Sequence, residues 1–175
     1  MRAVLIAMLA VALYALEVGQ KLPDVVMDGK IGKRVDGKPF RSKDLRGKIW
    51  LLIYSDPDKK SLNEDFFERV KAKHFDRSRY GSVAIVNMAA TWMPNFAISA
   101  LLKSKQKRYP DTIYVKDYKK YLVQRWGLRD DDMNVIILDK NLRVLFVAHG
   151  KMNEEQQRRA LRILEREVNG DREAL

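Results

Sequence analysis

Apolar and polar residues alternate along the chain in blocks that predict a regular succession of strands and helices. Short apolar runs between turn residues are typical of buried strands, whereas apolar residues spaced by three or four are typical of helices. The predicted strands cover residues 49–54, 83–88, 112–115, 135–138 and 142–147. The predicted helices cover residues 61–73, 94–107, 117–126 and 153–169. Crossovers imply parallel strands and the last two strands form a hairpin, so we predict an α/β fold with a central mixed sheet and helices on both faces.

The strand at residues 49–54 and the helix after it are the stretch around which the chain is organised. Ser61 and Glu64 form an S-x-x-E capping box, which would satisfy free N–H groups at the start of that helix. Chemistry is common at such a junction, because the helix end offers N–H donors and a positive dipole. This junction, however, has no cysteine, histidine or glycine-rich phosphate loop. We therefore interpret Ser61 as a helix cap rather than as a nucleophile, which would need a base beside it.

The first residues of the chain have the pattern of a secretory signal peptide. One positive charge at Arg2 is followed by an apolar run over residues 3–13 and by small residues. We predict cleavage after Ala15, with Ala12 as the alternative. Because Glu17 ends the run well before the roughly 20 apolar residues that a spanning helix needs, a retained membrane anchor is the second interpretation. The expected location is the periplasm.

The rest of the chain divides by composition into an extension, one domain and a tail. Residues 16–46 hold closely spaced glycines and prolines around short apolar pieces, which predicts an N-terminal extension with a hairpin. Residues 47–170 contain the predicted strands and helices and form the main domain. Residues 171–175 are a short C-terminal tail.

Charge and residue usage narrow the possible functions. The chain has a net charge of +11 and no cysteine, so disulfides and thiol catalysis are excluded. Residues 30–48 and residues 103–125 each hold eight basic and two acidic residues. Two such regions suit an anionic envelope surface, whereas nucleic acid is not an expected partner of an exported protein.

No cofactor or metal site is predicted. The three acids from Asp130 to Asp132 lack the spacing of an EF-hand loop and follow Arg129, so we interpret them as a solvated loop. His149 ends the last predicted strand and has Asp56 or Asp58 as conceivable partners, but nothing in the sequence brings these residues together.

Several short motifs resemble those of secreted thioredoxin-like proteins. They are Asp36-Gly37 with Leu45-Arg46-Gly47-Lys48 before the first main strand, and Leu138-Asp139-Lys140-Asn141 in the late hairpin. The element order is similar to the thioredoxin-like one with a peroxiredoxin-type insertion. Residues 84–87, 109–110, 117–126 and 135–147 extend the likeness to the YtfJ family, small bacterial proteins with a signal peptide and a poorly defined function. The resemblance implies a thioredoxin-like three-layer sandwich, often without the cysteine pair.

The resemblance also indicates where a binding site would lie. Asp58, Lys59, Lys60 and Ser61 fall where thioredoxin-like proteins carry C-x-x-C, and Met133 falls near the position of their late proline. Thiol–disulfide exchange requires a thiolate, so redox activity of that kind is excluded. Three hypotheses remain. The protein binds a protein or peptide in the groove near these residues, it carries a small-molecule site or non-thiol enzyme chemistry at the same helix start, or it associates with anionic envelope surfaces through its basic regions.

Overall fold

The computed structural model describes residues 15–170. The predicted signal segment, apart from Ala15, and the predicted C-terminal tail lie outside the described residues. Within residues 15–170, no helix is both long enough and apolar enough to span a membrane.

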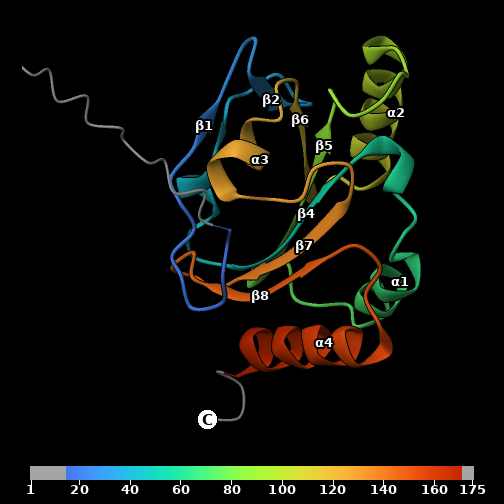
Figure 1. The fold of residues 1–175 in the computed structure, drawn as a ribbon. Coiled ribbons are helices and arrows are strands. Elements are labelled where there is room, and N and C mark those ends of the chain that lie inside the picture. Colours follow the sequence, from blue (N-terminus) through green and yellow to red (C-terminus); the bar gives the residue numbers. More distant parts are fainter. Residues whose placement is uncertain (1–14, 171–175) are drawn as a thin grey trace, which may run out of the picture.

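One six-stranded sheet runs through the centre of the protein (Figure 1). Its order is β2-β6-β5-β4-β7-β8, with β4, β5 and β6 parallel and the other three antiparallel to their neighbours. The strands are β2 Gly32–Arg34, β4 Ile49–Ser55, β5 Tyr80–Asn87, β6 Thr112–Asp117, β7 Met133–Leu138 and β8 Val144–His149. The mixed sheet and the order of its elements are therefore confirmed.

Helices cover both faces of the sheet. They are α1 Glu64–Ala72, α2 Asn95–Arg108, α3 Tyr121–Trp126 and α4 Glu154–Asn169. On one face, Phe66 of α1 and Ile163 of α4 pack with Leu51, and α2 packs beside them over Ala84 and Tyr114. On the other face, α3 packs through Leu122 and Trp126 against alternate residues of the same strands. The alternation of buried side chains to both faces is what a central, doubly covered sheet requires.

The N-terminal extension packs as part of the core. β1 (Val26–Met27) pairs with β3 (Phe40–Arg41), while β2 between them joins the edge of the main sheet beside β6. The side chains of Leu16, Leu22 and Met27 belong to the cluster that surrounds α3. A short 3₁₀ helix, Ser42–Leu45, then leads through Gly47 into β4.

The predicted capping box at Ser61 and Glu64 is wrong. After β4 the chain forms a 3₁₀ turn (Pro57–Lys59) and further turns, so that α1 begins only after Asn63. Ser61 is exposed, and only its backbone carbonyl accepts the N–H of Glu64, at 3.3 Å. The Asn63 side chain does not cap the helix either, because it is used in contacts with the loop before α4. The capping box predicted at Asn153 and Gln156, at the start of α4, is confirmed.

Candidate functional site

The strongest concentration of polar chemistry lies where the parallel strands end. Asp56 follows β4, Asn87 ends β5, and Asp117 ends β6. The loop holding Asp130 and Asp131 leads into β7 at the same edge, since the N–H of Asp56 reaches the carbonyl of Asp132, which directly precedes β7. The carboxyl ends of parallel strands are the usual place for a ligand in a sheet of this type.

Three carboxylates meet at this edge. One carboxylate oxygen from each of Asp56, Asp130 and Asp131 lies within 4.8 Å of the other two, and we call these residues the carboxylate cluster. Asp56 is only 3% exposed, and its Oδ1 has no hydrogen-bond partner in residues 15–170. Burial, followed by the charges of Asp131 and Asp130, raises the pKa of Asp56 to about 6, although Asn87 and Lys120 act in the opposite direction. A buried acid with one unsatisfied oxygen and a raised pKa is a common feature of functional sites.

Two side chains hold Asp130 in place. Asn87 donates to Asp130 Oδ1 at 3.0 Å, and the ammonium of Lys120 donates to Asp130 Oδ2 at 2.6 Å. Partial burial opposes ionisation of Asp130, but the hydrogen bond and charge of Lys120, together with hydrogen bonds from the Asp131 backbone and Asn87, outweigh it and lower the pKa of Asp130. The same hydrogen bond raises the pKa of Lys120. One acid of the cluster is therefore matched by a cation, while Asp56 is not.

A layer of buried polar groups supports the cluster. Asp117 accepts the N–H groups of Tyr121 and Leu122 at the start of α3 and the hydroxyl of Tyr54 at 3.3 Å. Burial and the charge of Asp117 raise the pKa of Tyr54, so its hydroxyl stays a donor. These contacts fix the ends of β4 and β6 relative to α3.

His149 belongs to a separate structural contact. Its Nδ1 lies 2.7 Å from Oδ1 of Asn134, which also accepts the N–H of Arg129. An amide oxygen only accepts, so Nδ1 carries the proton. Burial and then the charge of Arg129 lower the pKa of His149, which keeps the ring neutral near pH 7. The contact joins β7 to β8.

The predicted site residues lie at the same edge but in a different setting. Asp58, Lys59, Lys60 and Ser61 are exposed on the turns before α1. Met133 is 1% exposed, and its sulfur is 3.3 Å from Nδ2 of Asn63. The four exposed residues are accessible to a ligand, whereas Met133 lies beneath the surface. A binding groove formed by these five residues stays a prediction.

The carboxylate cluster itself was missed by the sequence-based interpretation. The loop over residues 130–132 was expected to be solvated, and Asp130 and Asp131 are indeed exposed, but both turn toward the buried Asp56. The signal present in the sequence is an acid directly after one buried strand and an asparagine at the end of the next.

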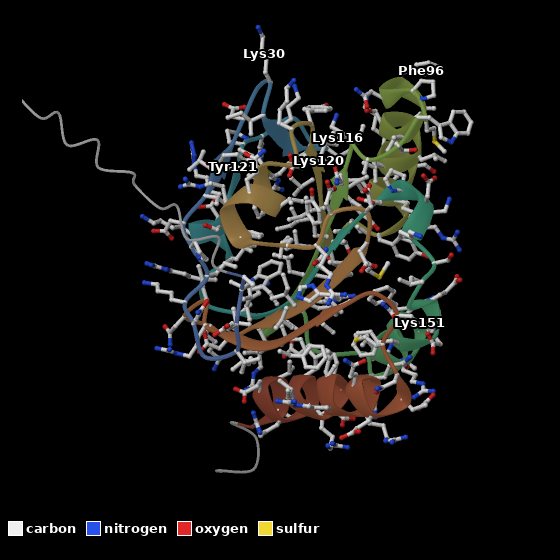
Figure 2. All side chains as sticks on the ribbon, viewed as in Figure 1. Lys30, Phe96, Lys116, Lys120, Tyr121 and Lys151 are labelled. Atoms are coloured by element: carbon white, nitrogen blue, oxygen red, sulfur yellow. The ribbon has the colours of Figure 1, made fainter. Side chains whose placement is uncertain are left out.

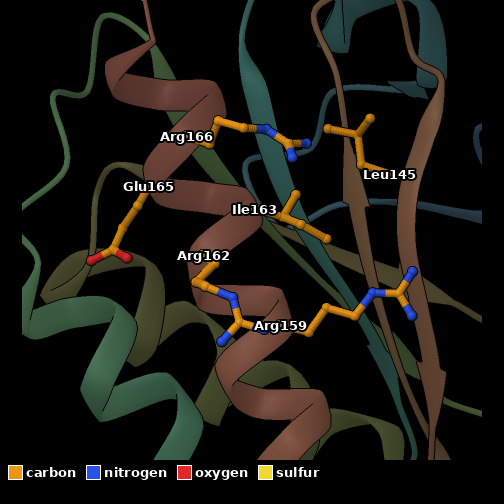
Figure 3. Close-up of a pocket in the computed structure, with 6 residues that line it drawn as sticks. All are labelled: Leu145, Arg159, Arg162, Ile163, Glu165 and Arg166. Carbon is orange, nitrogen blue, oxygen red and sulfur yellow. The ribbon is translucent and has the colours of Figure 1, made fainter. Parts of the chain in front are cut away.

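A basic hollow beside α4 is a weaker candidate for a binding site. It has a volume of about 540 Å³ and is lined by Leu145, Arg159, Arg162, Ile163, Glu165 and Arg166. Arg159 and Arg166 reach toward the strand that carries Leu145, whereas Glu165 points to the other side of the helix (Figure 3). Arg166 is already paired with Glu167 and Glu165 with Lys73. Arg159 and Arg162 form no ion pair within residues 15–170, so the hollow keeps a positive charge, but no buried polar group is directed into it.

The outward side of α2 is a second candidate surface. Phe96, Ala100, Lys103 and Lys107 are spaced to lie in one row, and all four are exposed. Trp92, just before the helix, is 88% exposed and Phe96 is 78% exposed. We call these five residues the α2 outer face. Figure 2 shows Phe96 at the outer end of α2, pointing away from the body of the protein.

Comparison with known proteins places the chain among proteins of undefined role. Residues 16–167 match the family described as "Bacterial protein of unknown function (YtfJ_HI0045)". An uncharacterised protein of Haemophilus influenzae is 30% identical over 150 residues, with 81% of each chain covered. The uncharacterised protein YtfJ of Escherichia coli is 25% identical over 170 residues, with 93% of this chain and 92% of the relative covered.

Solved structures show the fold. A putative protein disulfide isomerase from Bacteroides thetaiotaomicron is similar with a TM-score of 0.65 at 18% identity, covering 90% of this chain and 95% of that one. At this identity the likeness defines architecture only, and the architecture is thioredoxin-like. The absence of cysteine separates this chain from the chemistry that the neighbour's name describes.

Proposed function

Because the chain belongs to the YtfJ_HI0045 family of bacterial proteins of unknown function, and because its thioredoxin-like fold has no cysteine, we propose that it is an exported, non-redox protein that associates with anionic lipid surfaces of the cell envelope. The observation that carries the proposal is the α2 outer face. It has an exposed phenylalanine in line with two lysines, and an exposed tryptophan directly before the helix. Thiol–disulfide exchange and thiol peroxidase chemistry are excluded, since both require a thiolate.

The apolar end of the α2 outer face is unusual for a solvated helix. Ile98 and Leu102 already provide the side of α2 that packs on the sheet, so Trp92 and Phe96 are not needed for the core. Aromatic side chains are favoured at the boundary between lipid and water, where their rings leave water while polar neighbours stay hydrated. Exposed aromatic residues next to lysines are the composition of helices that lie on a membrane surface.

The segment that carries this face has only positive charges. From Thr91 to Pro110 the chain has four basic residues and no acidic residue. Within residues 15–170, none of Lys103, Lys105 and Lys107 forms an ion pair. Some of these cations suit the negative end of the helix dipole, but the dipole does not account for the aromatic residues at the other end.

The fold joins the two basic regions of the sequence at one edge of the sheet. β2 pairs with β6 so that Lys33 faces Lys116 across the strands. Val35, just after β2, packs in the same cluster as Ile98 and Leu102 of α2. The edge with Lys30, Lys33 and Arg34 is therefore a neighbour of α2. Arg34 is paired with Asp36 at 2.6 Å, so Lys30 and Lys33 are the charges on this edge that support attraction to an anionic surface.

Vesicle binding tests the proposal. We expect the exported chain to bind vesicles of phosphatidylglycerol and phosphatidylethanolamine at low salt, and to bind phosphatidylcholine vesicles much more weakly. Each basic residue near an anionic bilayer contributes roughly 1 kcal/mol, so the double variant K103Q/K107Q should bind about 30-fold more weakly. The double variant W92A/F96A should lose at least about tenfold, because its aromatic rings no longer leave water.

A charge-matched control shows whether the position of the lysines matters. The variant R159Q/R162Q also removes two positive charges, but from exposed positions on α4. Its vesicle binding should stay within about twofold of that of the unchanged protein. If K103Q/K107Q and R159Q/R162Q lost vesicle binding equally, net charge alone would cause the attraction, and the proposal would be contradicted. Absence of vesicle binding, together with crosslinking of a protein partner at Trp92, would assign the face to a protein instead.

Export is tested separately by fractionation. We expect the protein in the periplasmic fraction, with the mass of a chain that begins at Leu16. A cytoplasmic protein that retains residues 1–15 would contradict the export part of the proposal and leave the lipid measurements valid as chemistry of the purified chain.

A further inference from the structure

We infer that Asp56, Asp130 and Asp131 form a binding site for a divalent cation of the oxygen-preferring class, with Ca²⁺ as the best fit. The inference is independent of lipid association, because the cluster lies at the end of β4 and shares no residue with the α2 outer face.

The first argument is geometric. A carboxylate oxygen from each of three residues lies within 4.8 Å of the others, so one ion of ordinary oxygen-coordination distance reaches all three with small adjustments. The ligands come from two segments that the sheet holds together, since the backbone N–H of Asp56 contacts the carbonyl of Asp132 at 3.3 Å. The site is thus built by the fold rather than by one loop.

The second argument is the unsatisfied Asp56. Its side chain is almost fully buried and Oδ1 has no hydrogen-bond donor within the described chain. Leaving a buried acceptor without a partner costs roughly 1–3 kcal/mol, and more when it is charged. Most buried polar atoms in proteins have a partner. A cation between Asp56 and Asp131 would supply the missing one.

The third argument is charge. When ionised, the three carboxylates and the ammonium of Lys120 leave two net negative charges, which one divalent cation neutralises. Lys120 and Asn87 both donate to Asp130, so they orient this carboxylate. Carboxylate oxygens and no nitrogen or sulfur ligands favour Ca²⁺ or Mg²⁺ over zinc or copper.

Ca²⁺ fits better than Mg²⁺ for a physical reason. Asp130 and Asp131 are exposed and sit on a loop, and Ca²⁺ accepts irregular geometry with several waters, whereas Mg²⁺ demands a near-ideal octahedron. The site has three carboxylates, and one of them is already paired with a lysine, so we expect a low affinity for Ca²⁺. We expect a dissociation constant of about 0.1–1 mM, the range of extracellular calcium modules.

The test uses the exported chain after treatment with EDTA. Calcium is titrated by calorimetry at pH 7.5 and constant ionic strength. Manganese(II) is then used as a paramagnetic probe in amide NMR, where it should broaden the signals of residues 56, 87, 130 and 131 first. The variants D56N and D131N should each weaken calcium binding at least about tenfold, since each removes one charged ligand.

The variant D58N is the matched control. It makes the same chemical change two residues from Asp56, at an exposed position outside the cluster, and its calcium affinity should stay within about twofold. D131N alters an exposed side chain, so the test does not depend on whether D56N folds. No localised manganese broadening with no calcium heat up to 10 mM, or an equal loss in D58N and D131N, would overturn the inference. Lipid binding measured without calcium does not enter this result.

Discussion

Two groups of acidic residues in this protein have opposite environments. In the carboxylate cluster, the pKa of Asp56 is raised to about 6 by burial and by neighbouring acids. Where α1 meets α4, hydrogen bonds from Gln157 and then Lys151 lower the pKa of Asp65 to about 2. A carboxylate with donors on both oxygens stabilises the fold when it is charged, whereas a carboxylate buried beside other acids destabilises it. The difference indicates that ionised Asp65 stabilises the contact between α1 and α4, and it supports the inference that the carboxylate cluster binds a cation.

At the junction of α1 and α4, Asp65 and Glu154 both have hydrogen-bond donors for their carboxylates. Lys151 contacts Oδ1 of Asp65 at 3.1 Å, and Gln157 contacts Oδ2 at 2.8 Å. Arg69 contacts both oxygens of Glu154, at 3.1 and 2.9 Å. Each acid there has a donor from the other helix or from the loop before it. The carboxylate cluster lies at the other end of the turns that follow β4, and among residues 15–170 it pairs with a single cation, Lys120.

The largest effect is expected for Asn63→Ala, which removes the polar centre of the junction. Asn63 is fully buried, donates to the carbonyl of Gly150 at 2.9 Å and accepts the N–H of Met152 at 2.8 Å. Alanine leaves both backbone groups without a partner, and we expect the free energy of unfolding to fall by about 2–4 kcal/mol. Urea unfolding monitored by tryptophan fluorescence measures this change.

Asn95→Ala is the control for Asn63→Ala. Asn95 is exposed at the first turn of α2, and no side-chain hydrogen bond of this residue is found within residues 15–170. Its substitution should change the free energy of unfolding by less than about 0.5 kcal/mol. A comparable loss in the two variants would show that the bridge made by Asn63 does not carry the junction.

The second effect has the opposite sign. Asp56→Asn removes a buried charge that repels its neighbours, so without divalent cations at pH 7.5 we expect the protein to gain about 1–3 kcal/mol of stability. The folded pKa of Asp56 lies above its unfolded value of 3.8, so its penalty is absent below pH 4, develops as the pH rises to 6 and is complete above it. The stability of the unchanged protein should therefore fall over this range relative to that of the variant.

Unfolding curves of both proteins at pH 4, 5, 6 and 7.5 test this difference. A variant that is less stable at pH 7.5 than the unchanged protein in EDTA would mean that Asp56 supports the fold, and the contrast with Asp65 would be lost. Adding calcium should raise the stability of the unchanged protein only, because the variant has lost a ligand.

The sequence predicts the fold better than the site, for a physical reason. Strands such as residues 49–54 and the start of α4 at Asn153 are specified by local spacing and local capping, which are visible along the chain. The start of α1 was misplaced because Asn63 makes tertiary contacts that no local pattern encodes. The carboxylate cluster was missed because Asp56 and Asp131 are 75 residues apart in the sequence, and only the pairing of β4 with β7 brings them together.

The smallest effect is expected for Asp65→Asn. Asp65 is exposed, so solvent weakens its pair with Lys151, and the loss of stability at pH 7 should be smaller than the changes expected for Asn63→Ala and Asp56→Asn.

The direction of the pH dependence of Asp65→Asn is nevertheless informative. The folded pKa lies below the unfolded value of 3.8, so the stabilisation is present above pH 4 and is lost as the pH falls toward 2. Asp65→Asn should therefore match the unchanged protein near pH 2 and be less stable near pH 7, which is the reverse of Asp56→Asn. Glu68→Gln is the control on the same helix: within residues 15–170 Glu68 pairs with Lys71 of α1 alone, so at pH 7 this variant should lose less stability than Asp65→Asn, because the pair does not join two elements. If Asp65→Asn and Asp56→Asn instead changed stability in the same direction at pH 7, the two groups of acids would not differ in role.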